Sequence, residues 1–283
     1  MSADAREGIR FAELDWDTRA MRIEYEWISP GSSDQPLLVF LHEGLGSLAM
    51  WKDFPRILCA AVGMRGLVYS RPGYGRSTPR AQGERWGVDF MHRQAHELLP
   101  ALLAYLDVDT RVAPPWLFGH SDGASIALLH AARFPRAVSG CIVVAPHLFV
   151  EPLSVSSIAA ARRAYRETDL STRLARYHDD VESAFRGWND IWLDPAFASW
   201  NIEAEVARIE CPVLAIQGCD DEYGTLDQVR AIVRCLPVAR LVTFAACGHS
   251  PHRDQPARLV EEVTGFVSEH RQADPQHRGT QMA

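Results

Sequence analysis

Three short segments of the chain carry the residue types that nucleophilic catalysis needs. FGHSDGAS contains Ser121 in the pattern G-x-S-x-G, ACGHSPH contains His249, and AIQGCDDEYGT contains the adjacent carboxylates Asp220 and Asp221. A serine hydroxyl is a weak nucleophile until a base removes its proton, and a carboxylate must orient that base. Together the three segments predict acyl transfer through a serine nucleophile.

The segment around Ser121 is typical of a sharp turn between a strand and a helix. It follows the apolar run PPWLFGH at 114–120 and precedes the helical pattern ASIALLHAARF at 124–134, which is the context of a nucleophile elbow. Only residues without a side chain fit where the two arms of such a turn meet, which accounts for Gly119 and Gly123. We expect the turn to be strained and to expose the serine hydroxyl.

His249 is the histidine placed to act as the base. It follows the last apolar run, at 239–248, and precedes the last helical pattern, at 257–270. His252 is a nearby competitor that we expect to enter the helical region. The two aspartates lie between CPVLAIQG and LDQVRAIVRCL, so the chain order is serine, aspartate, histidine whichever aspartate serves.

An oxyanion needs backbone donors that are free to meet it. The segment LHEGLGS follows a buried apolar run, and its glycines leave backbone N–H groups open. We expect the N–H groups of Gly44 and Asp122 to form an oxyanion hole, with Leu45 as the alternative to Gly44. One such donor contributes about 2.7–4 kcal/mol in the transition state.

The elements that must position these residues alternate between strands and helices. Strand patterns occupy 21–28, 36–42, 65–70, 114–120, 139–146, 211–218 and 239–248, and helical patterns occupy 89–106, 124–134, 226–236 and 257–270. This alternation predicts a mostly parallel, doubly wound α/β sheet that is covered on both faces. Chemistry in such a sheet collects at the carboxyl ends of the strands.

Residues 147–206 interrupt the alternation. They contain no convincing strand pattern and carry many aromatic residues in helical patterns. We expect a helical insertion between two strands, whose aromatics largely pack its own core. The core domain is then formed by 1–146 and 207–270, and the polar, aperiodic residues 271–283 are expected to be a disordered tail.

Composition excludes several classes of function. The chain has 283 residues, 47% of them hydrophobic and 23% charged, and a net charge of −7, which argues against nucleic acid or anionic membrane as partners. No apolar run reaches the roughly 18 residues that span a bilayer, and the polar N-terminal residues do not predict a signal peptide. Six scattered cysteines without a CxxC pair predict a cytoplasmic protein without disulfides or a metal centre.

Together these segments resemble the α/β-hydrolase fold superfamily over about residues 22–270. The matching motifs, in chain order, are LHEGLGS, YSRPGYGRS, GHSDG, GCDD and CGHSP. The resemblance implies a serine hydrolase whose insertion at 147–206 forms a helical cap over the pocket. It also places the acid three residues after the glycine that ends the strand. From Gly218 this selects Asp221 and leaves Asp220 as a turn residue.

The chain departs from the family pattern at Glu43, where members usually have glycine. Glu43 either pairs with an arginine such as Arg71 or touches substrate.

Serine at the elbow favours hydrolysis of an ester, thioester, amide or lactone, or of an activated C–C bond, without metal or organic cofactor. A lyase or cofactor-independent oxygenase on the same scaffold, and a non-catalytic ligand receptor, are the alternatives. An aromatic cap suggests an apolar pocket for a small molecule. Candidate pocket residues, each of which could instead pack the core, are Trp51, His147, Trp188 and Trp192, with Arg71 or Arg186 for a substrate carboxylate. The sequence does not indicate an oligomeric state.

Overall fold

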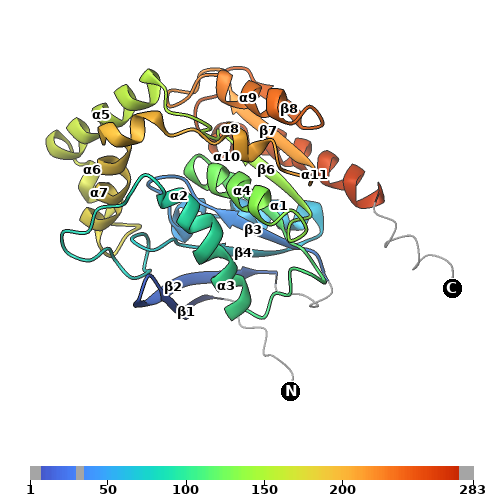
Figure 1. Cartoon of the computed structure of the whole chain (residues 1–283), viewed down its shortest axis with the longest axis horizontal. Coiled ribbons are helices and arrows are strands. Elements are labelled where there is room, and N and C mark those ends of the chain that lie inside the picture. Colours follow the sequence, from blue (N-terminus) through green and yellow to red (C-terminus); the bar gives the residue numbers. More distant parts are fainter. Residues whose placement is uncertain (1–7, 30–34, 274–283) are drawn as a thin grey trace.

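The chain folds around one sheet of eight strands. The computed structural model describes residues 8–29 and 35–273. The strand order is β1-β2-β4-β3-β5-β6-β7-β8; β2 pairs antiparallel with β1 and β4, and the other neighbours are parallel (Figure 1). The strands are β1 (Ile9–Trp16), β2 (Arg19–Ile28), β3 (Leu37–Leu41), β4 (Arg65–Tyr69), β5 (Trp116–His120), β6 (Gly140–Val144), β7 (Val213–Gly218) and β8 (Arg240–Phe244). The predicted mostly parallel sheet is confirmed.

Helices cover both faces of this sheet, and a cluster of buried apolar side chains fills the space on each. The covering helices are α1 (Phe54–Val62), α2 (Phe90–Arg93), η2 (Gln94–Leu98), α3 (Leu99–Tyr105), α4 (Asp122–Arg133), α9 (Asp227–Cys235), α10 (Pro251–Asp254) and α11 (Pro256–Ala273), with the short η1 (Leu48–Trp51) before α1. Successive side chains of β5 belong to opposite faces. Leu117 packs in the cluster beneath α3, α4 and α9, and Phe118 packs in the cluster beneath α1 and α11. The central strands are apolar throughout because both of their faces are covered.

The turn from β5 into α4 depends on two glycines. A Cβ on Gly119 would lie 2.4 Å from the carbonyl oxygen of Gly123, and a Cβ on Gly123 would lie 2.1 Å from the carbonyl oxygen of Leu41 in β3. Both distances are far inside van der Waals contact, so the first turn of α4 can pack on β3 only without side chains at these positions.

Residues 147–206 run between β6 and β7 as a succession of helices. These are α5 (Pro152–Glu167), α6 (Leu170–Leu174), α7 (Val181–Trp192), η3 (Pro195–Ser199) and α8 (Glu203–Val206). Within the described residues this segment contains no β-strand, only an isolated β-bridge between Phe149 and Asn201. In Figure 1, α5, α6 and α7 lie together at one end of the molecule.

Some elements were not predicted, or differ from the prediction. Strand β1 was missed; its residues alternate in burial at an exposed edge of the sheet. The helix expected at 89–106 is broken by the π-helical η2. Helix α11 continues to Ala273, three residues into the predicted tail, and Arg271 donates to the carbonyl of Val62 at 3.2 Å. The rest of that tail lies outside the described residues. Within 8–29 and 35–273, no helix is both long and apolar enough to cross a membrane.

The elbow packing can be tested with alanine. We expect Gly123→Ala to lower the free energy of unfolding by about 1–3 kcal/mol or more, because the new methyl group overlaps the backbone of β3. Gly265→Ala is the matched control, since Gly265 lies inside α11 and, apart from its chain neighbours and the backbone of its own helix, no atom lies within 4 Å of the added Cβ. It should stabilise the protein by up to about 1 kcal/mol. Urea unfolding measures both, and equal effects would contradict the close packing.

Candidate active site

Ser121 lies where β5 passes into α4. Its backbone has φ 54° and ψ −122°, a conformation that costs a residue with a side chain of order 1–3 kcal/mol. The strain persists because the flanking structure holds it: the N–H of Ser121 donates to the carbonyl of Val144 at 2.9 Å, and its own carbonyl accepts from Ala124 at 2.8 Å. Ser121 is only 6% exposed, so the expectation of an exposed serine is wrong, because the surrounding elements bury the residue. The strained turn predicted from G-x-S-x-G is therefore present.

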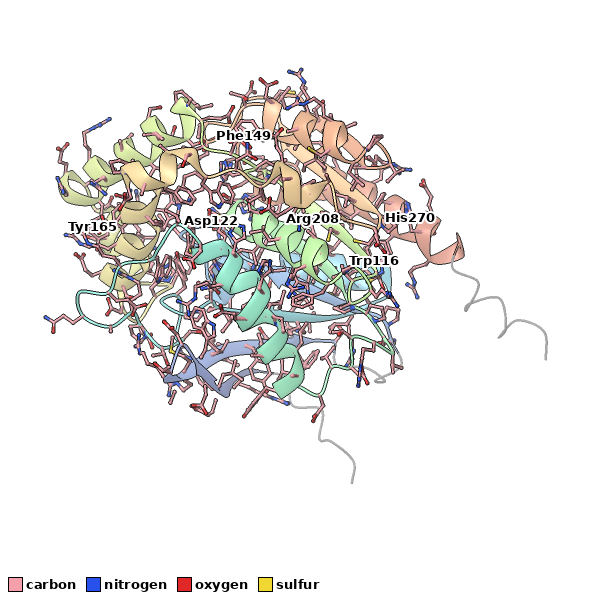
Figure 2. All side chains as sticks on the ribbon, viewed as in Figure 1. Trp116, Asp122, Phe149, Tyr165, Arg208 and His270 are labelled. Carbon is pink, nitrogen blue, oxygen red and sulfur yellow. The ribbon has the colours of Figure 1, made fainter. Side chains whose placement is uncertain are left out.

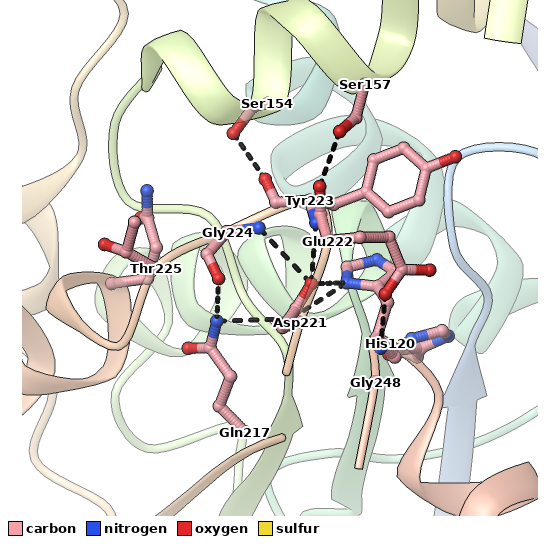
Figure 3. Close-up of polar contacts among 12 residues, drawn as sticks. His120, Ser154, Ser157, Gln217, Asp221, Glu222, Tyr223, Gly224, Thr225 and Gly248 are labelled. Atoms are coloured by element: carbon pink, nitrogen blue, oxygen red, sulfur yellow. Dashed lines mark hydrogen bonds and ion pairs between the residues drawn. The ribbon is translucent and has the colours of Figure 1, made fainter. Parts of the chain in front are cut away.

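Asp221 and His249 meet beyond the ends of β7 and β8. The Nδ1 atom of His249 lies 2.8 Å from Oδ1 and 3.0 Å from Oδ2 of Asp221. The carboxylate also accepts from Gln217 Nε2 at 3.1 Å and from the N–H of Tyr223 at 2.8 Å (Figure 3). Burial would raise the pKa of Asp221, but the hydrogen bond and charge of His249 hold it below its ordinary value of 3.8. Asp221 is thus a buried carboxylate with an imidazole as its partner.

Neither competing residue occupies a comparable place. The side chain of Asp220 is exposed, and its N–H donates to the carbonyl of Cys247 at 2.9 Å. His252 is buried against Trp51 and Phe54, with ring centroids 5.1 and 5.6 Å away. Burial lowers the pKa of His252 to about 2, so this ring stays neutral and packs as part of the core.

The loop after β3 presents the peptide between Glu43 and Gly44 in a fixed orientation. The carbonyl oxygen of Glu43 lies 2.7 Å from His42 Nδ1 and 2.8 Å from Arg71 Nη2, and it accepts from the N–H of Gly46 at 3.0 Å. The N–H of Arg71 donates to His42 Nε2 at 3.0 Å, so the proton of this neutral ring is on Nδ1 and points at the carbonyl. Because a trans peptide directs its N–H away from its C=O, the N–H of Gly44 faces the opposite side.

Asp122 contributes its amide and its carboxylate to the same region. It is the first residue of α4, where an N–H has no partner within the helix. Its buried carboxylate accepts from Trp192 Nε1 at 3.2 Å and lies 4.0 Å from Arg71 Nη2; Figure 2 places it in the interior at the start of α4. Burial raises the pKa of Asp122 to about 6, although Arg71 acts in the opposite direction.

One guanidinium therefore contacts both halves of the predicted oxyanion hole. Arg71 is fully buried, holding the Glu43 carbonyl on one side and facing the Asp122 carboxylate on the other. Within the described residues, no hydrogen bond is formed by the N–H of Gly44 or of Asp122.

The structure brings some of the predicted pocket residues to this site and not others. The indole of Trp188 covers Gly44, since a Cβ there would lie 2.2 Å from its Nε1. The ring of His147 lies 4.8 Å from that of Trp192 and 6.0 Å from that of His249, and burial lowers the pKa of His147 to about 3. Trp51 instead lies in the core beneath α1 and α11.

The two charged candidates are engaged in other contacts. Arg186 is exposed and pairs with Glu182 one turn away on α7. Arg71 contacts Glu43 through the backbone carbonyl of that residue, whereas the Glu43 carboxylate pairs with His120 and Arg253, at 3.6 and 3.4 Å. The expected pairing of Glu43 with an arginine therefore involves Arg253 rather than Arg71.

Several residues near His249 were not predicted. Gln217 bonds Asp221, Tyr223 places its ring 4.8 Å from the ring of His249, and Glu222 accepts from the His249 N–H at 3.1 Å. His120 also lies here, with its Nε2 2.7 Å from the His249 carbonyl oxygen. The sequence did contain a signal for three of these residues, because Glu222 and Tyr223 directly follow Asp221 and His120 directly precedes Ser121. No group of three or more metal-binding side chains occurs in the described part of the chain.

Comparison with known proteins gives consistent matches. A family model described as "Alpha/beta hydrolase family" matches residues 38–262. The chain is 23% identical over 240 residues to 2-hydroxy-6-oxo-6-phenylhexa-2,4-dienoate hydrolase of Burkholderia cepacia, covering 75% of this chain and 80% of the relative. It is 28% identical over 253 residues to monoglyceride lipase of Rattus norvegicus, covering 82% of each. The crystal structure of the enol-lactonase from Burkholderia xenovorans LB400 superposes with a TM-score of 0.68 at 18% identity, covering 90% of this chain and 99% of that one.

The buried charge of Asp122 should be visible in the pH dependence of stability. Between its ordinary pKa of 3.8 and the raised value of about 6, the folded protein binds a proton that the unfolded chain has released. Stability from this group therefore falls as pH rises through that window and is level above it. Asp122→Asn keeps an oxygen for Trp192 and removes the charge. In urea unfolding, its stability relative to wild type should increase by about 2 kcal/mol from pH 4 to pH 7; a constant difference would contradict the raised pKa.

Proposed function

The chain belongs to the alpha/beta hydrolase family and is a hydrolase, and from this premise we propose that it cleaves small carbonyl compounds through a catalytic triad of Ser121, His249 and Asp221. The observation that carries the proposal is the short contact between Asp221 and His249 Nδ1, at 2.8 Å. It leaves Nε2 of His249 available to a serine. The elbow is adjacent, because His120, which directly precedes Ser121, contacts the His249 carbonyl. Ester, thioester and lactone bonds are the proposed substrates.

In the proposed reaction, His249 takes the proton of Ser121 while the serine oxygen attacks the substrate carbonyl. The negative charge that develops on the carbonyl oxygen meets the N–H groups of Gly44 and Asp122, which need not reorganise because Arg71 already fixes the first of them. His249 then gives its proton to the leaving group, and the acyl-enzyme is hydrolysed by a water that the same ring activates. Asp221 keeps the proton of the neutral ring on Nδ1 and stabilises the imidazolium.

We assign residues 147–206 to a helical cap on a core domain formed by 1–146 and 207–270. Support comes from α7, whose Trp188 lies on Gly44 and whose Trp192 bonds Asp122. The cap side of the pocket is thereby aromatic, which suits an apolar acyl or leaving group. Small molecules are the proposed partners, and the scattered cysteines favour a reducing compartment such as the cytoplasm.

A second candidate is cleavage of an activated C–C bond. The Burkholderia cepacia relative is named as the hydrolase of a 2-hydroxy-6-oxo-dienoate, and His147 adds a neutral imidazole 6.0 Å from His249. The same triad and oxyanion donors would serve, with a carbon leaving group in place of an oxygen.

Labelling with a fluorophosphonate tests the proposed nucleophile. The wild-type protein should gain the mass of one adduct, and peptide mapping should locate it on Ser121. Ser121→Ala should gain none. Absence of an adduct on the folded wild-type protein would overturn the proposal. A panel of p-nitrophenyl esters, lactones, thioesters and 6-oxo-dienoates then separates the two candidate reactions.

The adjacent aspartates provide a matched pair of variants. Asp221→Asn should lower kcat about 10³–10⁴-fold, because an amide favours the wrong ring tautomer of His249. Asp220→Asn, the same change one residue away at an exposed position, should leave kcat within about twofold. Steady-state kinetics on a hydrolysed p-nitrophenyl ester measures both. A larger loss in Asp220→Asn than in Asp221→Asn would reverse the assignment.

A further inference from the structure

A second carboxylate–imidazole pair lies beside the proposed triad. The carboxylate of Glu43 lies against His120, with Oε2 3.6 Å from His120 Nδ1. Oε1 lies 3.4 Å from Arg253 Nη2. The Glu43 side chain is 16% exposed and that of Arg253 is 45% exposed, so the contact with His120 is the more buried of the two.

His120 faces an acceptor at each ring nitrogen. Its Nε2 lies 2.7 Å from the carbonyl oxygen of His249 and therefore donates to it. Its Nδ1 faces the Glu43 carboxylate. The Nε2 hydrogen bond fixes the orientation of the ring and turns Nδ1 toward Glu43. At 3.6 Å that contact is longer than a hydrogen bond, and Nδ1 has no hydrogen-bond partner within the described residues.

His249 is consequently held at three points. Its ring bonds Asp221, its N–H donates to the Glu222 carboxylate at 3.1 Å, and its carbonyl accepts from His120. The rings of His120 and His249 are also in contact, with centroids 5.0 Å apart. The contacts of Glu222 and His120 fix the backbone of His249, and with it the origin of the side chain that must reach Ser121.

We propose that Glu43 and His120 are positioning residues of the reaction, which hold the backbone of His249 from the loop that carries Gly44. The chain of contacts runs from the loop after β3, through the last residue of β5, to the loop after β8. It links the proposed oxyanion donor at Gly44 to the proposed base. This rests on the proposed function, because positioning His249 matters to catalysis only if His249 is the base.

The groups that face this pair set its charge. Burial opposes ionisation of Glu43, but His120 and Arg253 hold its pKa well below its ordinary value. His252, from α10, packs on His120 with ring centroids 4.8 Å apart and stays neutral. Arg71 lies on the carbonyl side of Glu43. The carboxylate is thus ionised at neutral pH, with His120 as its most buried partner.

The contact between Glu43 and His120 is tested by nitrogen NMR of histidine-labelled protein at pH 7. Because the Glu43 carboxylate lies 3.6 Å from His120 Nδ1, we expect Glu43→Gln to shift the ring-nitrogen signals of His120. Glu269→Gln is the matched control, because it makes the same change in an exposed ion pair with Arg240 and should leave the His120 signals unchanged. Unchanged His120 signals in Glu43→Gln would overturn the pairing. This measurement does not depend on any catalytic activity.

Kinetics tests the positioning role, with p-nitrophenyl acetate as substrate and the rate of fluorophosphonate labelling of Ser121 as a second readout. Glu43→Gln should lower kcat about 10-fold with KM within about twofold, and His120→Ala about 100-fold. His120→Gln, whose amide nitrogen can reach the His249 carbonyl, should recover most of that loss. Glu269→Gln should match wild type.

Wild-type kcat in folded Glu43→Gln, or His120→Gln as impaired as His120→Ala, would overturn the positioning role. If the proposed function itself is wrong, the result differs: the wild-type protein gains no fluorophosphonate adduct on Ser121.

Discussion

The candidate site depends on the close approach of the first turn of α4 to the end of β3. Gly123 lies against the carbonyl of Leu41, and that contact brings the amide of Asp122 and the loop of Gly44 to the same side of the sheet. A parallel sheet delivers the carboxyl ends of its strands to one edge. It does not bring two backbone segments into contact; that requires the absence of side chains at Gly119 and Gly123. The positive φ of Ser121 follows from the same constraint.

Buried charge then fixes what the backbone packing brings together. Arg71 has no exposed surface, yet it is compensated by the Glu43 carbonyl, the Asp122 carboxylate and the face of Tyr74, whose centroid is 4.8 Å away. A buried ion pair is weak support for stability on its own. In this protein Arg71 connects the loop after β3 to the start of α4, so its structural value is in orientation.

Much of this could be predicted from sequence because it depends on local chemistry. Apolar runs predict the central strands and G-x-S-x-G predicts the strained turn. The choice of Asp221, which contacts His249, came instead from the family resemblance, which places the acid three residues after Gly218. Contacts between distant side chains could not be predicted in the same way. Arg71 and Arg253 are two of many arginines that could pair with Glu43. No residue near Glu43 in the sequence indicates that His120 is its partner. Strand β1 was missed because its edge position leaves a weak apolar signal.

The contact of Trp188 with Gly44 has a consequence for redesign of the specificity of this protein. If the proposed cap assignment holds, the helical segment 147–206 is the place to exchange sequence for a different pocket, because it is inserted between two strands of an intact sheet. Its α7, however, also forms the wall directly behind the peptide of Gly44. A graft that lacks a flat side chain at position 188 would leave a void behind that peptide. A new segment at 147–206 must therefore be exchanged together with the loop after β3, so that the side chain at position 188 still fits against Gly44.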